Sequence, residues 1–121
     1  MQYEFKIIAF TNESQFSIDL ATECNKYGFS LDFLNTLDDI EDEINDDIIA
    51  AAIIDLNDDN FNPFDLCKSI KKMHGLPVFG VLNKFSRNMQ EKAKKNGYDL
   101  IFTKKMLIRS IRDVIIHVSN E

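Results

Sequence analysis

Short apolar runs alternate with helix-like stripes along the whole of this chain. The runs fall at residues 5–10, 29–33, 48–56, 76–82 and 100–103. Buried strands that alternate with helices predict a parallel sheet covered on both faces. Because crossover connections are right-handed, few topologies remain for a chain of this length. The pattern therefore predicts an α/β fold in three layers, with one five-stranded sheet between two layers of helices.

Between these runs, apolar residues recur at helical spacing. The stripes comprise Phe16, Leu20, Cys24 and Tyr27; Leu37, Ile40 and Ile44; Leu66, Cys67, Ile70 and Met73; Met89 and Ala93 within 86–96; and Leu107, Ile108, Ile111, Val114, Ile115 and Val118. Asn12 followed by Gln15 predicts the N-cap of the first helix and its reciprocal partner. Gly28, Gly75 and Gly97 each follow a stripe and predict a helix end.

Length and composition favour one globular domain over residues 1–121. Hydrophobic residues make up 45% of the chain and charged residues 28%, which is typical of folded soluble proteins. The longest apolar run, 48–54, is far shorter than the roughly 20 residues that a membrane span needs. The N-terminus lacks the basic-then-apolar pattern of a signal peptide. We therefore expect a reduced, cytoplasmic protein.

Cysteine and histidine offer no readable site. Cys24 and Cys67 fall on the inward stripes of helices that are expected on opposite faces of the sheet, so we predict two buried thiols and no disulfide. His74 and His117 have no Cys or His at ligand spacing, which favours helix-end or surface positions over a metal site. The chain has no Gly-rich phosphate loop and no recognisable catalytic triad. We identify no catalytic residue and expect no enzyme activity.

Charge is divided unevenly along the chain, whose net charge is −6. Residues 1–60 hold 15 acids and two bases, whereas residues 61–121 hold five acids and 12 bases. The acidic half would repel phosphates, so we expect no nucleic-acid partner. The asymmetry indicates either a binding face or two solvated faces of opposite sign.

Polar residues follow directly after several of the apolar runs. In open α/β sheets, ligands bind at this position, beyond the carboxyl ends of the strands. These residues are Thr11 and Asn12, Asp55, Asn83 after Leu82, and Lys104 with Lys105.

This arrangement resembles the receiver domain of two-component response regulators over essentially the whole chain. Residues 52–57, AIIDLN, look like the family's third strand and place Asp55 at the phosphoacceptor position. Residues 76–81, LPVFGV, are similar to its fourth strand, and residues 96–104, NGYDLIFTK, to its fifth, with Lys104 at the position of the invariant lysine. The resemblance implies a flavodoxin-like fold with strand order 2-1-3-4-5 and a role in phosphorelay signalling.

The sequence departs from the family at several site positions. Two adjacent acids follow the family's first strand, where this chain has Thr11 and Asn12. The family has Thr or Ser at the end of the fourth strand, where this chain has Leu82. The proline after the lysine, the switch aromatic of the fifth strand and the Asp-Gly before the third helix are replaced by Lys105, Ile101 and Asn62-Pro63.

These departures remove the groups that phosphoryl transfer to a carboxylate requires. A cation must neutralise the developing charge, and Mg²⁺ needs hard oxygen ligands. Asn12 offers only a neutral oxygen, Glu13 comes one position too late, and Leu82 has no hydroxyl for the phosphoryl oxygens. We therefore predict a pseudo-receiver that is not phosphorylated and has no cofactor. Its degenerate site comprises Thr11, Asn12, Asn57, Leu82 and Lys105.

Alternatives remain for the residues that are left. Asp55 and Lys104 form either a partly buried ion pair or a residual acceptor site with poor metal affinity. Asp58 and Asp59 are either a solvated turn or alternative metal ligands. In the alternative function, Asp55 is phosphorylated with atypical Mg²⁺ ligands and relays a signal. A small enzyme of flavodoxin-like fold is a third hypothesis.

The resemblance also implies a partner-binding face on the fourth helix, fifth strand and fifth helix. Ile101 lies on the strand of this face. Seven bases of the second half fall in these elements: Arg87, Lys92, Lys94, Lys95, Lys105, Arg109 and Arg112. Charge concentrated on one face steers association with an acidic partner. We expect another signalling protein or a second copy of the chain there, and no membrane.

Overall fold

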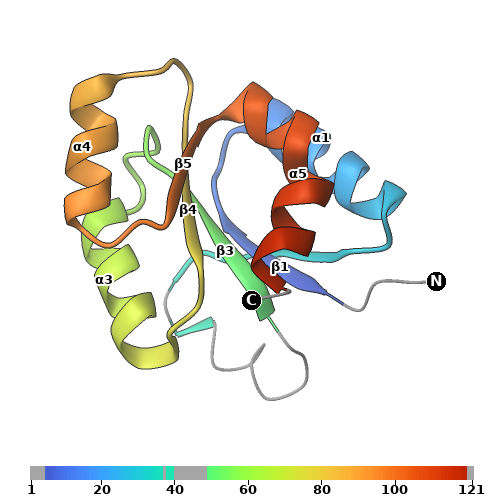
Figure 1. The fold of residues 1–121 in the computed structure, drawn as a ribbon, viewed down its shortest axis with the longest axis horizontal. Helices are drawn as coiled ribbons and strands as arrows, with labels where there is room; N and C mark the ends of the chain where they lie inside the picture. Colours follow the sequence, from blue (N-terminus) through green and yellow to red (C-terminus); the bar gives the residue numbers. More distant parts are fainter. Residues whose placement is uncertain (1–4, 37, 40–48, 120–121) are drawn as a thin grey trace.

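One parallel sheet lies between two layers of helices in the computed structural model, which describes residues 5–36, 38–39 and 49–119 (Figure 1). The strand order is β2-β1-β3-β4-β5, as predicted. The elements are β1 (Lys6–Phe10), α1 (Ser14–Lys26), β2 (Ser30–Phe33), β3 (Ile49–Asp55), α3 (Pro63–His74), β4 (Val78–Leu82), α4 (Arg87–Lys95), β5 (Leu100–Thr103) and α5 (Lys104–Ser119).

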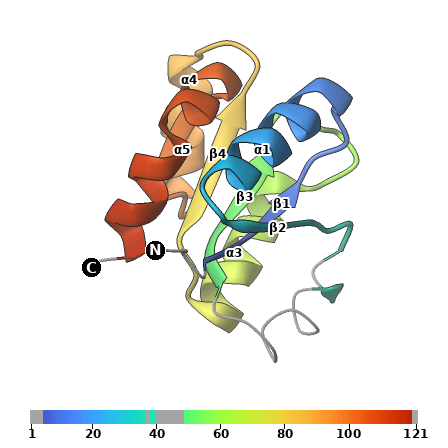
Figure 2. The same ribbon diagram turned by 90° about the vertical axis from the view of Figure 1, so that its right-hand side faces the viewer.

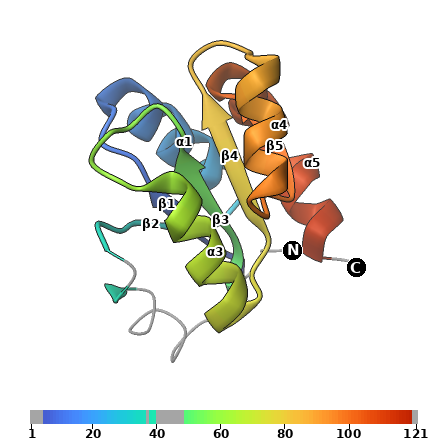
Figure 3. The same cartoon turned by 90° about the vertical axis from the view of Figure 1, so that its left-hand side faces the viewer.

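Helices α1 and α5 cover one face of the sheet, and α3 and α4 cover the other (Figures 2 and 3). Successive side chains of a strand point to opposite faces, so the continuous apolar run of β3 supplies two cores. Ile53 packs with Leu20 and Ile111 under α1 and α5. Its neighbour Ile54 packs with Ile70 under α3 and α4.

The first helix begins one residue later than predicted, and its cap is a different residue. Glu13 is the N-cap, because its carboxylate accepts a hydrogen bond from the backbone N–H of Phe16. The backbone N–H of Asn12 instead donates to Asp58 Oδ2 over 2.7 Å. The side chain of Gln15 hydrogen-bonds one turn further along the helix rather than reaching back. Asn12 therefore precedes the cap and contacts the loop after β3.

The buried stripe of α3 is shorter than predicted. Cys67 and Ile70 are fully buried, but Met73 is 55% exposed, since it lies in the last turn beyond the buried positions. The predicted helix carrying Leu37, Ile40 and Ile44 cannot be compared, because these three residues lie outside the described residues.

Both cysteines are free and buried, which confirms the prediction. Cys24 belongs to the core under α1 and Cys67 to the core under α3, on opposite faces of the sheet. Burial raises the pKa of the Cys24 thiol to about 12, and that of Cys67 to about 11. Both therefore act as small apolar side chains rather than as nucleophiles. Separately, no helix in the described part of the chain combines the length and the apolar character needed to span a membrane.

Candidate functional site

Three buried polar side chains meet at the carboxyl ends of the strands. Asp55 is the last residue of β3, Thr11 follows β1, and Lys104 begins α5 directly after β5. They are 1%, 6% and 9% exposed, respectively. Because the strands are parallel and in register, their ends bring these residues to one edge of the sheet.

Hydrogen-bond donors of the chain occupy both oxygens of the Asp55 carboxylate. Oδ2 accepts from the Thr11 hydroxyl over 2.8 Å and from the Lys104 ammonium over 2.8 Å. Oδ1 accepts from the backbone N–H of Asn57 over 2.9 Å. A buried carboxylate is stable only when it is paired and hydrogen-bonded in this way. The predicted ion pair is thus present, and Thr11 belongs to it.

Thr11 connects this buried group to the start of α1. Its Oγ1 donates to Asp55 and also accepts from the backbone N–H of Glu13 over 3.2 Å. The ring of Phe16 lies 5.5 Å from the Lys104 ammonium, which adds a cation–π contact. The hydroxyl that replaces an acid is therefore part of an internal network that links β1, β3 and α5.

The loop after β3 is held by its own side chains. Asn57 Oδ1 accepts from the backbone N–H of Asn83 over 2.7 Å, which ties the ends of β3 and β4 together. Asp58 accepts from the backbone N–H groups of Asn12 and Asn60 and from the Asn60 amide. Burial alone would raise the pKa of Asp58, but these hydrogen bonds outweigh it and hold that pKa below its ordinary value. The Asp58 carboxylate therefore organises a turn, whereas Asp59 is exposed.

The positions at the end of β4 and in β5 where the sequence departs from the resembled family carry packed apolar side chains. Leu82 is buried in the core under α3 and α4. Ile101 packs against the same core, where its Cδ1 lies close to Gly80. Lys105 is exposed in the first turn of α5, and no cis peptide bond occurs in the described residues.

The carboxylates near the strand ends do not form a Mg²⁺ ligand set. Asp55 carries an ammonium and a hydroxyl on one oxygen, and Asp58 carries three donors. Glu13 uses its carboxylate to cap α1. Within the ranges described, no three His, Cys, Asp or Glu side chains converge as metal ligands. The residues present do not fit the ion that the resemblance implies.

The structure divides the predicted basic face into two parts. On α4, Arg87 lies 3.4 Å from Glu91, and the Lys92 ammonium lies 4.5 Å from the centre of the Phe64 ring. Lys105 and Arg109 line a pocket together with residues of α1, so they lie on the α1 side of α5 rather than beside the bases of α4. Arg112 pairs with its exposed neighbour Asp113 over 3.2 Å. Lys94 and Lys95 of α4 are exposed.

Sequence reasoning missed that pocket, which Glu13, Gln15, Phe16 and Asp19 of α1 line opposite Ile108 of α5. The relevant signal is the pattern of acids on one helix and bases on another. It becomes readable only when the two helices are known to be neighbours.

Comparison with known proteins finds similarity in structure alone. No family model and no curated protein matches the sequence. A two-component response regulator from Clostridium difficile superposes with a TM-score of 0.77 at 15% identity, over 97% of this chain and 99% of that one. A CheY-like receiver domain protein from Methanospirillum hungatei gives 0.74 at 12% identity, over 98% of each chain.

HP1043, an orphan response regulator of H. pylori, gives a TM-score of 0.73 at 16% identity, over 95% of this chain and 99% of that one. These identities are low, but the superpositions extend over almost all of each chain. The chain therefore has the flavodoxin-like fold of response-regulator receiver domains.

Proposed function

We propose that this chain is a pseudo-receiver in two-component-type signalling, and that it binds a partner protein without being phosphorylated and without acting as an enzyme. The observation that carries the proposal is that donors of the chain itself already bind both oxygens of the Asp55 carboxylate. Its carboxylate oxygens accept from Thr11, Lys104 and Asn57, so the chain itself supplies the positive charge and the donors.

Phosphorylation would have to break this network. A carboxylate attacks phosphorus through a free oxygen, and a metal must approach the same group to neutralise charge. Here Oδ2 already accepts two donors. Among the described residues nearby, the Glu13 carboxylate caps α1 and the Asp58 carboxylate accepts three donors of its own. Loss of the Lys104 contact would leave the Asp55 charge buried without its ionic partner, and loss of the Thr11 contact would remove a hydrogen bond from it; both are costly.

The packing around Leu82 and Ile101 supports the same proposal. A hydroxyl at the end of β4 would be needed to contact phosphoryl oxygens, but Leu82 buries an apolar side chain in the core. Ile101 packs against that core, and its side chain has no polar atom that could form a hydrogen bond in response to a change at Asp55. A domain built in this way holds one conformation and presents a constant surface to a partner.

We propose the surface formed by α4, β5 and the adjoining side of α5 as the partner site. The exposed bases Lys94 and Lys95 have no ion-pair partner in the described ranges, and they suit an acidic partner surface. Exposed apolar side chains accompany them at Phe85, just before α4, and at Met106, in the first turn of α5. The partner is another signalling protein or a second copy, and neither a nucleic acid nor a membrane.

Magnesium binding tests the degenerate site. Thr11→Asp combined with Asn12→Asp restores the family's two acids, whereas Thr11→Asn beside the native Asn12 gives the neutral counterpart with the same shape. Calorimetric titration with Mg²⁺ should show saturable binding for the acidic variant and none for the neutral variant or the native chain. Native binding as tight as that of the acidic variant, and lost in Asp55→Asn, would contradict the proposal.

Charge reversal tests the partner surface. Lys94→Glu with Lys95→Glu on α4 is compared with Lys105→Glu with Arg109→Glu on α5, because both pairs reverse two exposed charges. Only the α4 pair should weaken self-association in sedimentation velocity or co-purification of a partner, with the melting temperature nearly unchanged. If only the α5 pair weakens self-association or co-purification, the partner site lies on the α1 side of α5 and the proposed surface is wrong.

A further inference from the structure

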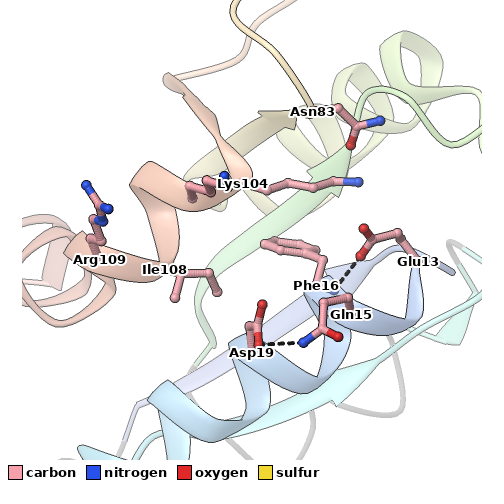
Figure 4. Close-up of a pocket in the computed structure, with 9 residues that line it drawn as sticks. Glu13, Gln15, Phe16, Asp19, Asn83, Lys104, Ile108 and Arg109 are labelled. Carbon is pink, nitrogen blue, oxygen red and sulfur yellow. Dashed lines mark hydrogen bonds between the residues drawn. The ribbon is translucent and has the colours of Figure 1, made fainter.

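A pocket of about 430 Å³ opens between α1 and α5, next to Lys104. Figure 4 shows the Phe16 ring between the two helices, with Glu13 at the N-cap of α1, Asp19 on α1, and Ile108 and Arg109 on α5. This volume lies within the usual range for small-molecule sites. The pocket is distinct from the proposed partner surface, and the inference goes beyond the proposed function without depending on it.

The wall that α1 contributes is acidic. Glu13 accepts the backbone N–H of Phe16, and Asp19 accepts the Gln15 side-chain amide over 2.9 Å. Both donors are neutral, so they orient the carboxylates but leave each with its negative charge. Neither acid forms an ion pair within the part of the chain that the structure describes.

The wall that α5 contributes is basic. Lys105 and Arg109 are exposed, lie one turn apart and have no ion-pair partner among residues 5–36, 38–39 and 49–119. The Lys104 charge is already balanced by Asp55 at 2.8 Å. Two uncompensated cations on one helix thus stand across the pocket from two uncompensated anions on the other.

The walls do not close on each other, and the surface between them is apolar. No ion pair joins α1 to α5 across the pocket in the described residues, since each acid accepts from neutral groups of its own helix. Phe16 is buried at the base, and Ile108 is half-buried beside it. A ligand that pairs with both walls and covers this surface carries both charges and an apolar part.

We propose that this pocket binds a small zwitterion with an apolar side group, of the class of a free apolar amino acid. A simple anion is repelled by Glu13 and Asp19, and a simple cation by Lys105 and Arg109. A zwitterion places its ammonium toward α1 and its carboxylate toward α5, and its apolar group covers Phe16. Each charge then gains a partner, and none is buried alone.

The test titrates ¹⁵N-labelled protein with three probes that share one apolar group. L-phenylalanine carries both charges, N-acetyl-L-phenylalanine only the anion, and L-phenylalaninamide only the cation. We expect amide shifts in α1 and the first turns of α5 with all three probes. Affinity should be about five-fold higher for L-phenylalanine, because each exposed ion pair contributes modestly.

Two variants test the charge assignment. Asp19→Asn should lower the affinity for L-phenylalanine to that for the N-acetyl probe, and Arg109→Gln should lower it to that for the amide probe. Arg112→Gln and Asp113→Asn make the same chemical changes on the outer side of α5, where these two residues pair with each other, and should change nothing. Equal affinities for the three probes, shifts confined to other elements, or unchanged preferences in both pocket variants would overturn the proposal.

Discussion

The Thr11 hydroxyl donates a hydrogen bond to the Asp55 carboxylate, with 2.8 Å between Oγ1 and Oδ2. The same oxygen receives the Lys104 ammonium at 2.8 Å. Asp55 is 1% exposed, so its charge depends on these two side chains and on one backbone N–H for its stability.

Removing the Thr11 hydroxyl should destabilise the fold measurably. Thr11→Val keeps the shape of the side chain but takes one donor from a buried carboxylate, which costs about 2 kcal/mol. Thr11→Ser keeps the donor and loses one methyl group, which costs about 1 kcal/mol. Urea denaturation measures both. A Val variant as stable as the Ser variant would show that the hydrogen bond contributes little.

Lys104 and Asp55 should be strongly coupled in a double-mutant cycle. Lys104→Met leaves the Asp55 charge buried without its partner, and we expect a loss of about 3–5 kcal/mol in the free energy of unfolding. Asp55→Asn combined with Lys104→Met removes both charges and should lose less than the two single changes together. Additivity within about 0.5 kcal/mol would contradict the coupling.

Asp58 should make stability depend on pH in the acid range. Its pKa is lower in the folded protein than in the unfolded chain, where it is about 3.9. The stabilisation is therefore complete above that value and is lost as pH falls through the folded pKa. Asp58→Asn should cost about 1 kcal/mol at neutral pH, since it weakens hydrogen bonds to a charged acceptor.

The difference between the native chain and Asp58→Asn should begin to shrink below about pH 4, where the unfolded chain takes up the proton, and should be lost as pH falls through the lower pKa of the folded carboxyl. Urea denaturation at several pH values measures this difference in the free energy of unfolding. Asp59→Asn is the matched control, because Asp59 is the exposed neighbour. A deficit that is constant with pH, or equal in the two variants, would contradict the role of Asp58.

The two thiols should be unreactive in the folded protein. With pKa values of about 12 for Cys24 and about 11 for Cys67, almost no thiolate is present near pH 8, and both side chains are buried. Iodoacetamide should add no mass in native buffer and two adducts in denaturant. Rapid modification of either cysteine in native buffer would require local opening of α1 or α3.

The sheet could be predicted from the sequence because buried parallel strands leave continuous apolar runs. Strand β5 begins and ends where the sequence predicts, and the order of the strands follows from the resemblance. The start of α1 could not be predicted, because Asn is a favoured N-cap and Glu is not, whereas in the structure Glu13 caps the helix and Asn12 contacts Asp58, 46 residues away.

At the site, the pairing of Asp55 with Lys104 could be predicted, but the role of Thr11 could not. A threonine in place of an acid indicates only a missing ligand, whereas its hydrogen bond to Asp55 depends on the distance between β1 and β3. The α1–α5 pocket depends likewise on which sides of two helices face each other. For that reason the sequence alone places Lys105 and Arg109 on one face with the bases of α4, whereas in the structure they line the pocket with α1.

The phosphorylation state of Asp55 is the central claim, and intact mass measures it directly. The native chain and Asp55→Asn are incubated with acetyl phosphate and Mg²⁺, and again with EDTA in place of the metal. The occupied carboxylate predicts an unchanged mass in all four samples. A gain of one phosphoryl group that requires Mg²⁺ and is absent from Asp55→Asn would contradict the account and establish a working phosphoacceptor.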